Sequence, residues 1–181
     1  MNQFYSNNKR NFLDRIATMY YRSKLKSCDN TVMFDAFVHL MRFPRNIILK
    51  SGVYIKGGVR LCVCNNKAFI KIGKNTTVGY NTFIFSSEAI SIGDDCMIAP
   101  NVYFVDSDHG TDRERLMNTQ SNVTAAIEVG DDVWIGTGAV ILKGAHIPTG
   151  CIIAANSVIK GKLEPYTIYG GIPAKKIGLR E

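Results

Sequence analysis

Residues 127–159 read IEVGDDVWIGTGAVILKGAHIPTGCIIAANSVI, and an aliphatic residue returns at every sixth position of this stretch. The anchors are Val129, Ile135, Ile141, Ile147, Ile153 and Ile159. A step of six matches neither the 3.6-residue period of a helix nor the long, strict alternation of a single strand. It is the hexapeptide repeat of a parallel β-helix, in which each hexad supplies one short strand and one tight turn.

The same step recurs earlier in the chain, in three runs of three anchors: Leu49, Ile55, Leu61; Ile72, Val78, Ile84; and Ile92, Ile98, Phe104. A small or compact residue often stands four positions after an anchor, where it fits a narrow corner: Thr76, Thr82, Cys96, Val102, Val133, Ala139, Ala145, Cys151 and Ser157. The register slips after Leu61 and after Ile84, which we interpret as bulges or short loops at corners. Three hexads close one triangular coil of roughly 18 residues, so about six coils are expected to stack around one core.

The composition favours one domain of an all-β protein. The chain has 181 residues, of which 46% are hydrophobic. No apolar run approaches ~18 residues, so no transmembrane helix is expected, and the first ten residues lack the apolar stretch of a signal peptide. Five scattered cysteines show no disulfide or zinc spacing, which favours a cytoplasmic location. We expect a helical, basic segment over residues 1–46, a β-helix over 47–168 and a C-terminal cap over 169–181.

The net charge of +7 is concentrated near the N-terminus, where residues 1–50 hold nine Lys or Arg against three Asp. Residues 10–26 predict a helix whose apolar stripe includes Phe12, Ile16, Met19 and Tyr20. One interpretation is that this helix packs across the first coil and covers its open strand edge. The other is peripheral contact with an anionic membrane at its inner face. No recognition motif accompanies the charge, so no nucleic-acid partner is expected.

Residues 106–125 break the hexad pattern completely and are expected to project from one corner as an arm. A polar insertion of this length inside a compact solenoid is usually functional. His109 stands where the coil ends, directly after Asp106 and Asp108. A histidine held by a carboxylate at a rim suits a general base, because its ordinary pKa is near neutrality. A solvent-exposed loop histidine without a role is the plain alternative.

The stretch IGDDCMIAPNV at 92–102, followed by Asp108-His109-Gly110 and an arginine-bearing loop, resembles the hexapeptide-repeat acetyltransferases of the maltose/galactoside O-acetyltransferase type. The stretches VWIGTGAVI at 133–141 and GIPAK at 171–175 resemble them as well, so the resemblance covers about residues 70–177. It implies a left-handed β-helix, a homotrimer with active sites at the subunit seams, acetyl-CoA as donor and His109 as the base. Asp106 or Asp108 would orient the imidazole.

Carried over by position, the resemblance also implies the residues that line the acetyl-CoA groove: Trp134, Gly136, Thr137, Ala155, Lys160 and Lys175. Trp134 has a plain alternative in packing between subunits, and the two lysines in solvated charge. Two departures concern the acceptor. Gly110 stands where the family has Pro, and the family's acceptor-binding Asn falls near Gly79 here.

Asn81 or Ser87 substitutes for the missing Asn in this interpretation, and Arg113 in the arm completes the candidate acceptor contacts. The chain looks closest to surface-polysaccharide O-acetyltransferases, which predicts direct acetyl transfer to a sugar or polysaccharide hydroxyl without a metal. An aminosugar amine or an antibiotic is the alternative acceptor. A γ-carbonic-anhydrase-like metalloenzyme is more distant, because its third histidine is missing; a non-catalytic scaffold is the remaining alternative.

Overall fold

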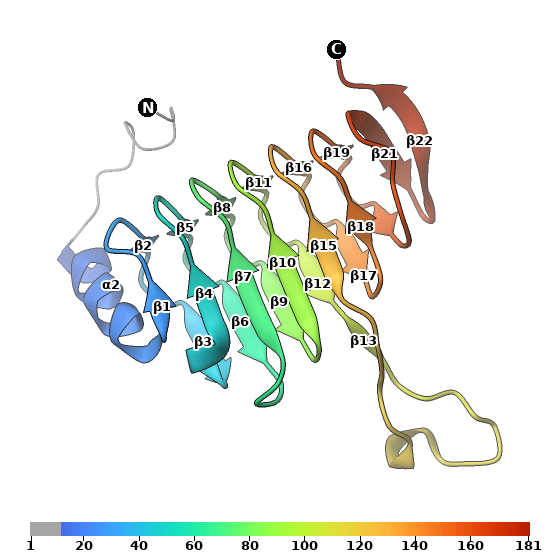
Figure 1. The fold of residues 1–181 in the computed structure, drawn as a ribbon, viewed down its shortest axis with the longest axis horizontal. Coiled ribbons are helices and arrows are strands. Elements are labelled where there is room, and N and C mark those ends of the chain that lie inside the picture. The colour runs from blue at the N-terminus through green and yellow to red at the C-terminus, as the bar shows by residue number, and fades with distance from the viewer. Residues whose placement is uncertain (1–11) are drawn as a thin grey trace.

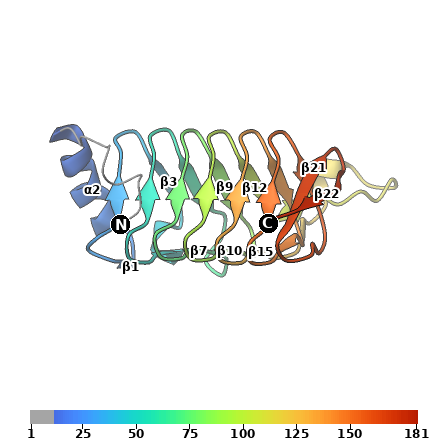
Figure 2. The same ribbon diagram turned by 90° about the horizontal axis from the view of Figure 1, so that it is seen from above.

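The computed structural model describes residues 12–181, which form a three-sided parallel β-solenoid of about six turns (Figure 1). The turns stack in a row, with one helix at the N-terminal end and a hairpin at the C-terminal end (Figure 2). Three parallel sheets, called faces A, B and C, run the length of the solenoid. The sequence-predicted β-helix is therefore confirmed.

Each turn contributes one strand to each face in the order A, B, C. Face A consists of β1 (Ser27–Cys28), β4 (Ile47–Leu49), β7 (Phe69–Ile72), β10 (Ala89–Ile92), β15 (Ile127–Val129) and β18 (His146–Ile147). Face B consists of β2 (Met33–Phe34), β5 (Tyr54–Ile55), β8 (Thr77–Val78), β11 (Met97–Ile98), β16 (Trp134–Ile135), β19 (Ile152–Ile153), β21 (Thr167–Gly171) and β22 (Ala174–Leu179). Face C consists of β3 (His39–Arg42), β6 (Arg60–Val63), β9 (Phe83–Ser86), β12 (Tyr103–Val105), β17 (Val140–Leu142) and β20 (Val158–Ile159).

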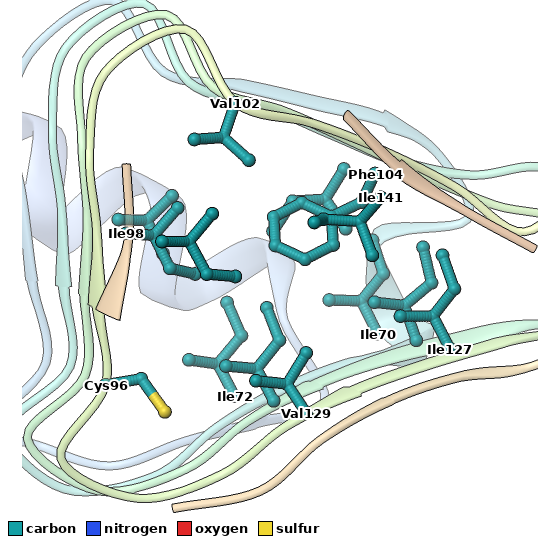
Figure 3. Close-up of a cluster of buried hydrophobic side chains, with 14 of the residues drawn as sticks. Ile70, Ile72, Cys96, Ile98, Val102, Phe104, Ile127, Val129 and Ile141 are labelled. Atoms are coloured by element: carbon teal, nitrogen blue, oxygen red, sulfur yellow. The ribbon is translucent and has the colours of Figure 1, made fainter. Parts of the chain in front are cut away.

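The hexad anchors point inward and stack on one another through the three faces. Figure 3 shows Ile98 of face B, Phe104 and Ile141 of face C, and Val129 of face A converging on one core. Phe104 pairs with Ile141 in register, and all four side chains are at most 5% exposed. The compact residues predicted for the corners are buried too, Cys96 among them. Stacking identical positions of successive turns gives each anchor apolar neighbours above and below, which a single coil lacks.

The corner between faces B and C is regular and is called the B/C corner. One residue of each turn takes a left-handed backbone conformation there: Phe37, Gly58, Asn81, Asn101, Gly138 and Asn156, with φ between +57° and +74°. Gly and Asn tolerate this conformation better than other residues, which explains why they recur at this position of the hexad.

The first turn begins at Ser27, twenty residues before the predicted start of the β-helix at 47. Its inward residues are Cys28, Phe34 and Leu40, which keep the spacing of six but vary in side-chain type. Such variety weakens the periodic signal, because the pattern depends on recurring aliphatic residues.

Helix α2 (Phe12–Lys24) covers the end of this first turn, as one of the two interpretations predicted. The Thr18 hydroxyl bonds both the N–H and the C=O of Phe34, and the Tyr21 ring packs on the Phe34 ring. The apolar stripe, however, does not face the coil. Phe12 and Met19 are each more than 70% exposed. Residues 10 and 11 of the predicted helix lie outside the described residues. No helix within residues 12–181 is long and apolar enough to span a bilayer.

Candidate active site

The corner between faces C and A, called the C/A corner, collects every irregularity of the repeat. The short helix η1 (Pro44–Asn46) lies there in the first turn, and the two predicted register slips after Leu61 and Ile84 lie there in the next two. Residues 106–125 leave the solenoid at the same corner, between β12 and β15, and project as an arm (Figure 1). Loops stacked on one corner build a surface that the regular corners lack.

Asp106 anchors this corner from inside. Its carboxylate is fully buried and accepts hydrogen bonds from the backbone N–H groups of Ser87 (2.6 Å), Glu88 (2.9 Å) and Ala89 (2.9 Å), and from the Ser86 hydroxyl (3.1 Å). These four donors belong to the preceding turn. The sequence analysis expected Asp106 or Asp108 to orient the imidazole of His109. Within residues 12–181 no hydrogen bond joins Asp106 to His109, so the carboxylate holds the corner instead.

The arm begins and ends as an antiparallel ribbon of β13 (Ser107–Asp108) and β14 (Val123–Thr124). His109 follows β13 directly, and its side chain is exposed. The carboxylate of Asp108 lies 3.3 Å from the Lys143 ammonium, which also reaches the carbonyl oxygen of Val123 at 3.5 Å. Lys143 therefore ties both strands of the ribbon to the next turn. In the described part of the chain the His109 ring has no hydrogen-bond partner, which leaves both ring nitrogens available to a substrate.

Gly110, the departure from the family pattern, is buried against the returning half of the arm. A Cβ at this position would lie 2.7 Å from the Gln120 Cβ, so a side chain there would force the arm open. Gln120 also bonds Asp112 and Arg115 across the tip. The arm contains the short helix η2 (Met117–Thr119).

The predicted acceptor residues fall at different places. Ser87 lies at the C/A corner, with its hydroxyl 3.1 Å from that of Ser107 at the start of the arm. Arg113 lies on the arm with its side chain 91% exposed and paired to the adjacent Glu114. Asn81 lies at the B/C corner, on the other side of face C. The structure thus brings Ser87 near the base of the arm and places Asn81 away from it.

Most of the predicted cofactor residues gather on face B. Trp134 points outward from β16 with half of its surface exposed, and Gly136 and Thr137 follow this strand. Ala155 occupies the same register on the next turn as Thr137. A Cβ on Gly136 would come within 2.6 Å of the Ala155 backbone nitrogen, so glycine lets the two turns approach closely. The two turns therefore stack tightly beside Trp134, with the Gly136 N–H bonded to the Ile153 carbonyl.

The two predicted phosphate-binding lysines are exposed and separate from each other. Lys175 lies on β22, paired with Gly170 of β21 at the C-terminal end of face B. Lys160 follows β20 at the end of face C and therefore lies toward the C/A corner, on the side of His109. The predicted cofactor residues are thus divided between two sides of the solenoid.

Face B also holds a groove of about 430 Å³ that the sequence analysis missed. It runs over four turns, from Lys56 past Tyr80 and Met97 to Trp134. Lys56 is only 7% exposed, and its ammonium lies 3.8 Å from the centre of the Tyr54 ring. Burial lowers the pKa of Lys56, while Asp35 and Asp14 act in the opposite direction. One sequence signal was available: Lys56 follows an anchor at the position where later turns have Gly79, Ala99, Gly136 and Ala154.

His109 and Trp134 lie on different sides of the molecule. The arm leaves at the C/A corner, whereas the strands of face B, β16 among them, lie on the opposite side (Figure 1). One copy of the chain therefore does not bring the imidazole and the predicted cofactor groove together. Across residues 12–181 no three His, Cys, Asp or Glu side chains gather closely enough to hold a metal ion.

Comparisons with known proteins agree with this architecture. The family model "Bacterial transferase hexapeptide (six repeats)" matches residues 126–161, and "Hexapeptide repeat of succinyl-transferase" matches residues 69–104. The chain is 30% identical over 160 residues to the putative lipopolysaccharide biosynthesis O-acetyl transferase WbbJ of Escherichia coli K12. That match covers 81% of this chain and 82% of WbbJ.

A second relative, the galactoside O-acetyltransferase of Escherichia coli K12, is 32% identical over 108 residues, which are 60% of this chain and 52% of that enzyme. The chain spans about half the length of several curated relatives it matches. Among solved structures, AntD, an N-acyltransferase from Bacillus cereus in complex with dTDP and 3-hydroxybutyryl-CoA, has a TM-score of 0.80. It is 20% identical, and the match covers 90% of this chain and 87% of AntD, so it shows a shared fold.

Proposed function

Because the chain belongs to the hexapeptide-repeat acetyltransferases, we propose that it transfers the acetyl group of acetyl-CoA to a hydroxyl of a sugar or surface polysaccharide. The observation that carries this proposal is the position of His109. It stands exposed at the base of the only arm of the described solenoid, on a ribbon fixed by Asp108 and Lys143. WbbJ, the relative that matches over most of its length, is named for O-acetyl transfer in lipopolysaccharide biosynthesis.

The separation of His109 from Trp134 points to a site shared between copies of the chain. The outward side chains of face C include a ladder of apolar residues: Phe83 packs on Phe85 and Tyr103, with the Arg60 guanidinium 4.6 Å from the Phe83 ring centre. If three copies turn face C toward a common axis, the C/A corner of one copy lies beside the B/C corner of the next. That arrangement completes the site at each seam of a homotrimer.

The same arrangement accounts for the divided residues. Trp134, Gly136, Thr137 and Ala155 of one copy would line the pantetheine arm of acetyl-CoA, with Lys175 toward the nucleotide phosphates. Lys160 would come from the copy that supplies His109. Exposed lysines suit phosphate contacts, because their ammonium groups are flexible point charges. Asn81 of the first copy would then face the acceptor together with Ser87 and Arg113 of the second.

In this mechanism His109 accepts the proton of the acceptor hydroxyl as the oxygen attacks the thioester carbonyl. The tetrahedral intermediate collapses, the carbon–sulfur bond breaks, and the imidazolium returns its proton to the leaving coenzyme A sulfur. Asp106 and Asp108 act as positioning residues. Asp106 fixes the corner from which the arm starts, and Asp108 fixes the ribbon that ends at His109. Holding both substrates at one seam supplies much of the rate through orientation.

The test is an acetyl-CoA thioester-cleavage assay with a panel of sugars, aminosugars and polysaccharide fragments. We expect His109→Ala to lower the rate about 10²- to 10⁴-fold, the usual contribution of a general base. His146→Ala is the matched control, because His146 is also partly exposed but pairs with Glu128 on face A. A rate close to that of the unmodified protein in His109→Ala would contradict the proposed base.

The acetylated product separates the hydroxyl acceptor from the amine. Alkaline hydroxylamine cleaves an acetyl ester and leaves an acetyl amide intact. We expect the product to lose its acetyl group under this treatment. A resistant product would favour N-acetylation.

A further inference from the structure

The groove on face B has the shape of a ligand subsite. It runs along the solenoid axis from the second turn to the fifth, so at the strand spacing of ~4.8 Å it is roughly 14 Å long. Its apolar lining includes Met97, Ile98, Ala99 and Pro100. Small-molecule sites are typically concave and apolar, with a few polar groups that orient the ligand. The groove lies on the N-terminal side of Trp134, whereas the proposed cofactor edge lies on its C-terminal side.

Lys56 is the charged group of this groove. The residue is more than nine-tenths buried, and within residues 12–181 its ammonium has no hydrogen-bond acceptor and no carboxylate at ion-pair distance. Its described contacts are with the faces of Tyr54 and Tyr80, at 3.8 and 5.6 Å from the ring centres. The two rings compensate the charge of this largely buried side chain only in part, and an anionic ligand would add a charge-assisted hydrogen bond to it.

Asp35 and Asp14 act on Lys56 through space, and no ion pair within 4.0 Å joins either carboxylate to the ammonium in residues 12–181. One oxygen of Asp35 accepts a hydrogen bond from the Tyr54 hydroxyl at 2.6 Å, and the other from the Gly57 N–H at 3.1 Å. Asp35 thereby holds Tyr54 under the ammonium. The donors of Lys56 remain free to bind an acceptor that enters the groove.

Two exposed rings line the groove, Tyr80 beside the Lys56 ammonium and Trp134 at the far end. Trp134 is 50% exposed and Tyr80 is 49% exposed. An aromatic face with an apolar surround suits a pyranose ring, whose axial C–H bonds form an apolar side while its hydroxyls stay hydrated. A lone inorganic anion would leave this apolar area unused, and a neutral sugar would leave Lys56 unpaired.

We propose that this groove is an acceptor subsite for an acidic pyranose, in which Lys56 binds the carboxylate or phosphate of the sugar and Trp134 and Tyr80 contact its ring. The inference rests on the proposed function, since it names the class of acceptor that the site selects. A charge-assisted hydrogen bond in a partly dry groove is stronger than a neutral one. The ion pair between Lys56 and the acidic group then distinguishes acidic from neutral sugars, whereas contact with the Trp134 and Tyr80 rings contributes affinity for both.

The experiment measures the dissociation constants of glucuronic acid, glucose 6-phosphate and glucose for the full chain, by titration followed with ligand-observed NMR. We expect at least one of the two acidic sugars to bind about tenfold or more tightly than glucose. The acid that binds more tightly tells a carboxylate from a phosphate. Lys56→Met should abolish this preference, whereas Lys71→Met, which removes an exposed lysine from face A, should retain it. Equal binding of all three sugars, or a preference that survives Lys56→Met, would overturn the proposal.

Two further measurements keep the test decisive. Trp134→Ala should weaken all three sugars by a similar factor, because the ring contact does not depend on charge. In the unmodified protein, reductive methylation followed by mass spectrometry needs no variant. The acidic sugar that binds should slow modification of Lys56 while glucose does not, and Lys71 should react equally in all samples. Methylation of Lys56 that the acidic sugars leave unchanged would contradict the inference.

Failure of this inference is distinguishable from failure of the proposed function. If acetyl-CoA is cleaved with an acceptor in a His109-dependent way but the sugars bind without regard to charge, the transferase proposal stands and the acidic subsite falls. If acidic sugars bind through Lys56 but no acetyl-CoA is consumed with any acceptor, the groove is an acidic-sugar site, and both the transferase proposal and the acceptor role of the groove fall.

Discussion

The B/C corner and the C/A corner are built on the same six-residue repeat, yet their turns differ in length and in regularity. At the B/C corner each turn repeats one left-handed residue, usually Gly or Asn, and no residue is inserted. At the C/A corner the turns differ in length and one of them carries the arm with His109. The B/C corner is regular because successive turns pack closely there, and an extra residue would push them apart. The proposed chemistry lies at the corner whose turns vary in length.

The largest expected effect is the recovery of activity when two inactive variants are assembled into one trimer. His109→Ala removes the proposed base at the C/A corner, and Trp134→Ala removes the proposed cofactor contact on face B. Each variant alone should lose at least about tenfold in transfer activity, because truncation of a buried Trp contact typically costs more than about 1 kcal/mol of binding free energy. When the two are unfolded together and refolded at equal amounts, about a quarter of the seams in a random trimer receive both intact residues. Activity should therefore return to a similar fraction of the unmodified rate. No recovery in a trimer that forms normally would place both residues in one copy's site.

Asp106→Ala should have the next largest effect, on stability. Removal of the carboxylate leaves three backbone N–H groups of the preceding turn without their acceptor, which should lower the free energy of unfolding by about 3 kcal/mol or more. Urea denaturation followed by circular dichroism measures this loss. Asp108→Asn is the control, because its exposed ion pair with Lys143 is worth less than about 1 kcal/mol. Equal losses in both variants would remove the structural role assigned to Asp106.

Two glycine substitutions compare the corners directly. Gly138 at the B/C corner and Gly161 at the C/A corner have similar left-handed conformations, with φ of +69° and +75°. A Cβ on Gly138 would lie 2.2 Å from the Asn156 Oδ1, whereas a Cβ on Gly161 meets no atom within 4 Å. Gly161→Ala should cost about 1 kcal/mol from backbone conformation alone.

Gly138→Ala should cost more, by about 1 kcal/mol, because the Asn156 side chain must also shift. The same urea titrations give both values. If the two substitutions cost the same, stacking at the B/C corner is no tighter than at the C/A corner.

Several elements were predictable because the sequence states them locally. The anchors from Val129 to Ile159 are buried as the period of six required, and the break at residue 106 marks the start of the arm. The first turn was missed because Cys28, Phe34 and Leu40 keep the period with three unlike side chains. The helix α2 covers the coil as one of the two interpretations had it, but its apolar stripe is exposed, since Thr18 and Tyr21 make the contact.

The candidate site likewise contains residues that the sequence could name and contacts that it could not. His109 could be named from its residue type and its place after two aspartates, and Trp134 from the family resemblance; their roles remain proposals. The buried contacts of Asp106 could not be foreseen, because its donors come from the preceding turn, about twenty residues earlier. Lys56 gave only a faint signal, one lysine in a column of small residues.

The sequence alone determined that the backbone coils with a period of six, that apolar anchors fill its interior, and that one polar segment leaves it. These properties follow from local spacing, which each hexad carries by itself. Only the tertiary structure decided which residues of distant turns meet: Asp106 with the corner at 86–89, Lys56 with Tyr80 and Trp134 along one groove, and His109 on the side opposite that groove. Such meetings depend on how many residues each corner inserts, because every insertion changes the sequence separation of residues that still stack in register, such as Phe104 and Ile141.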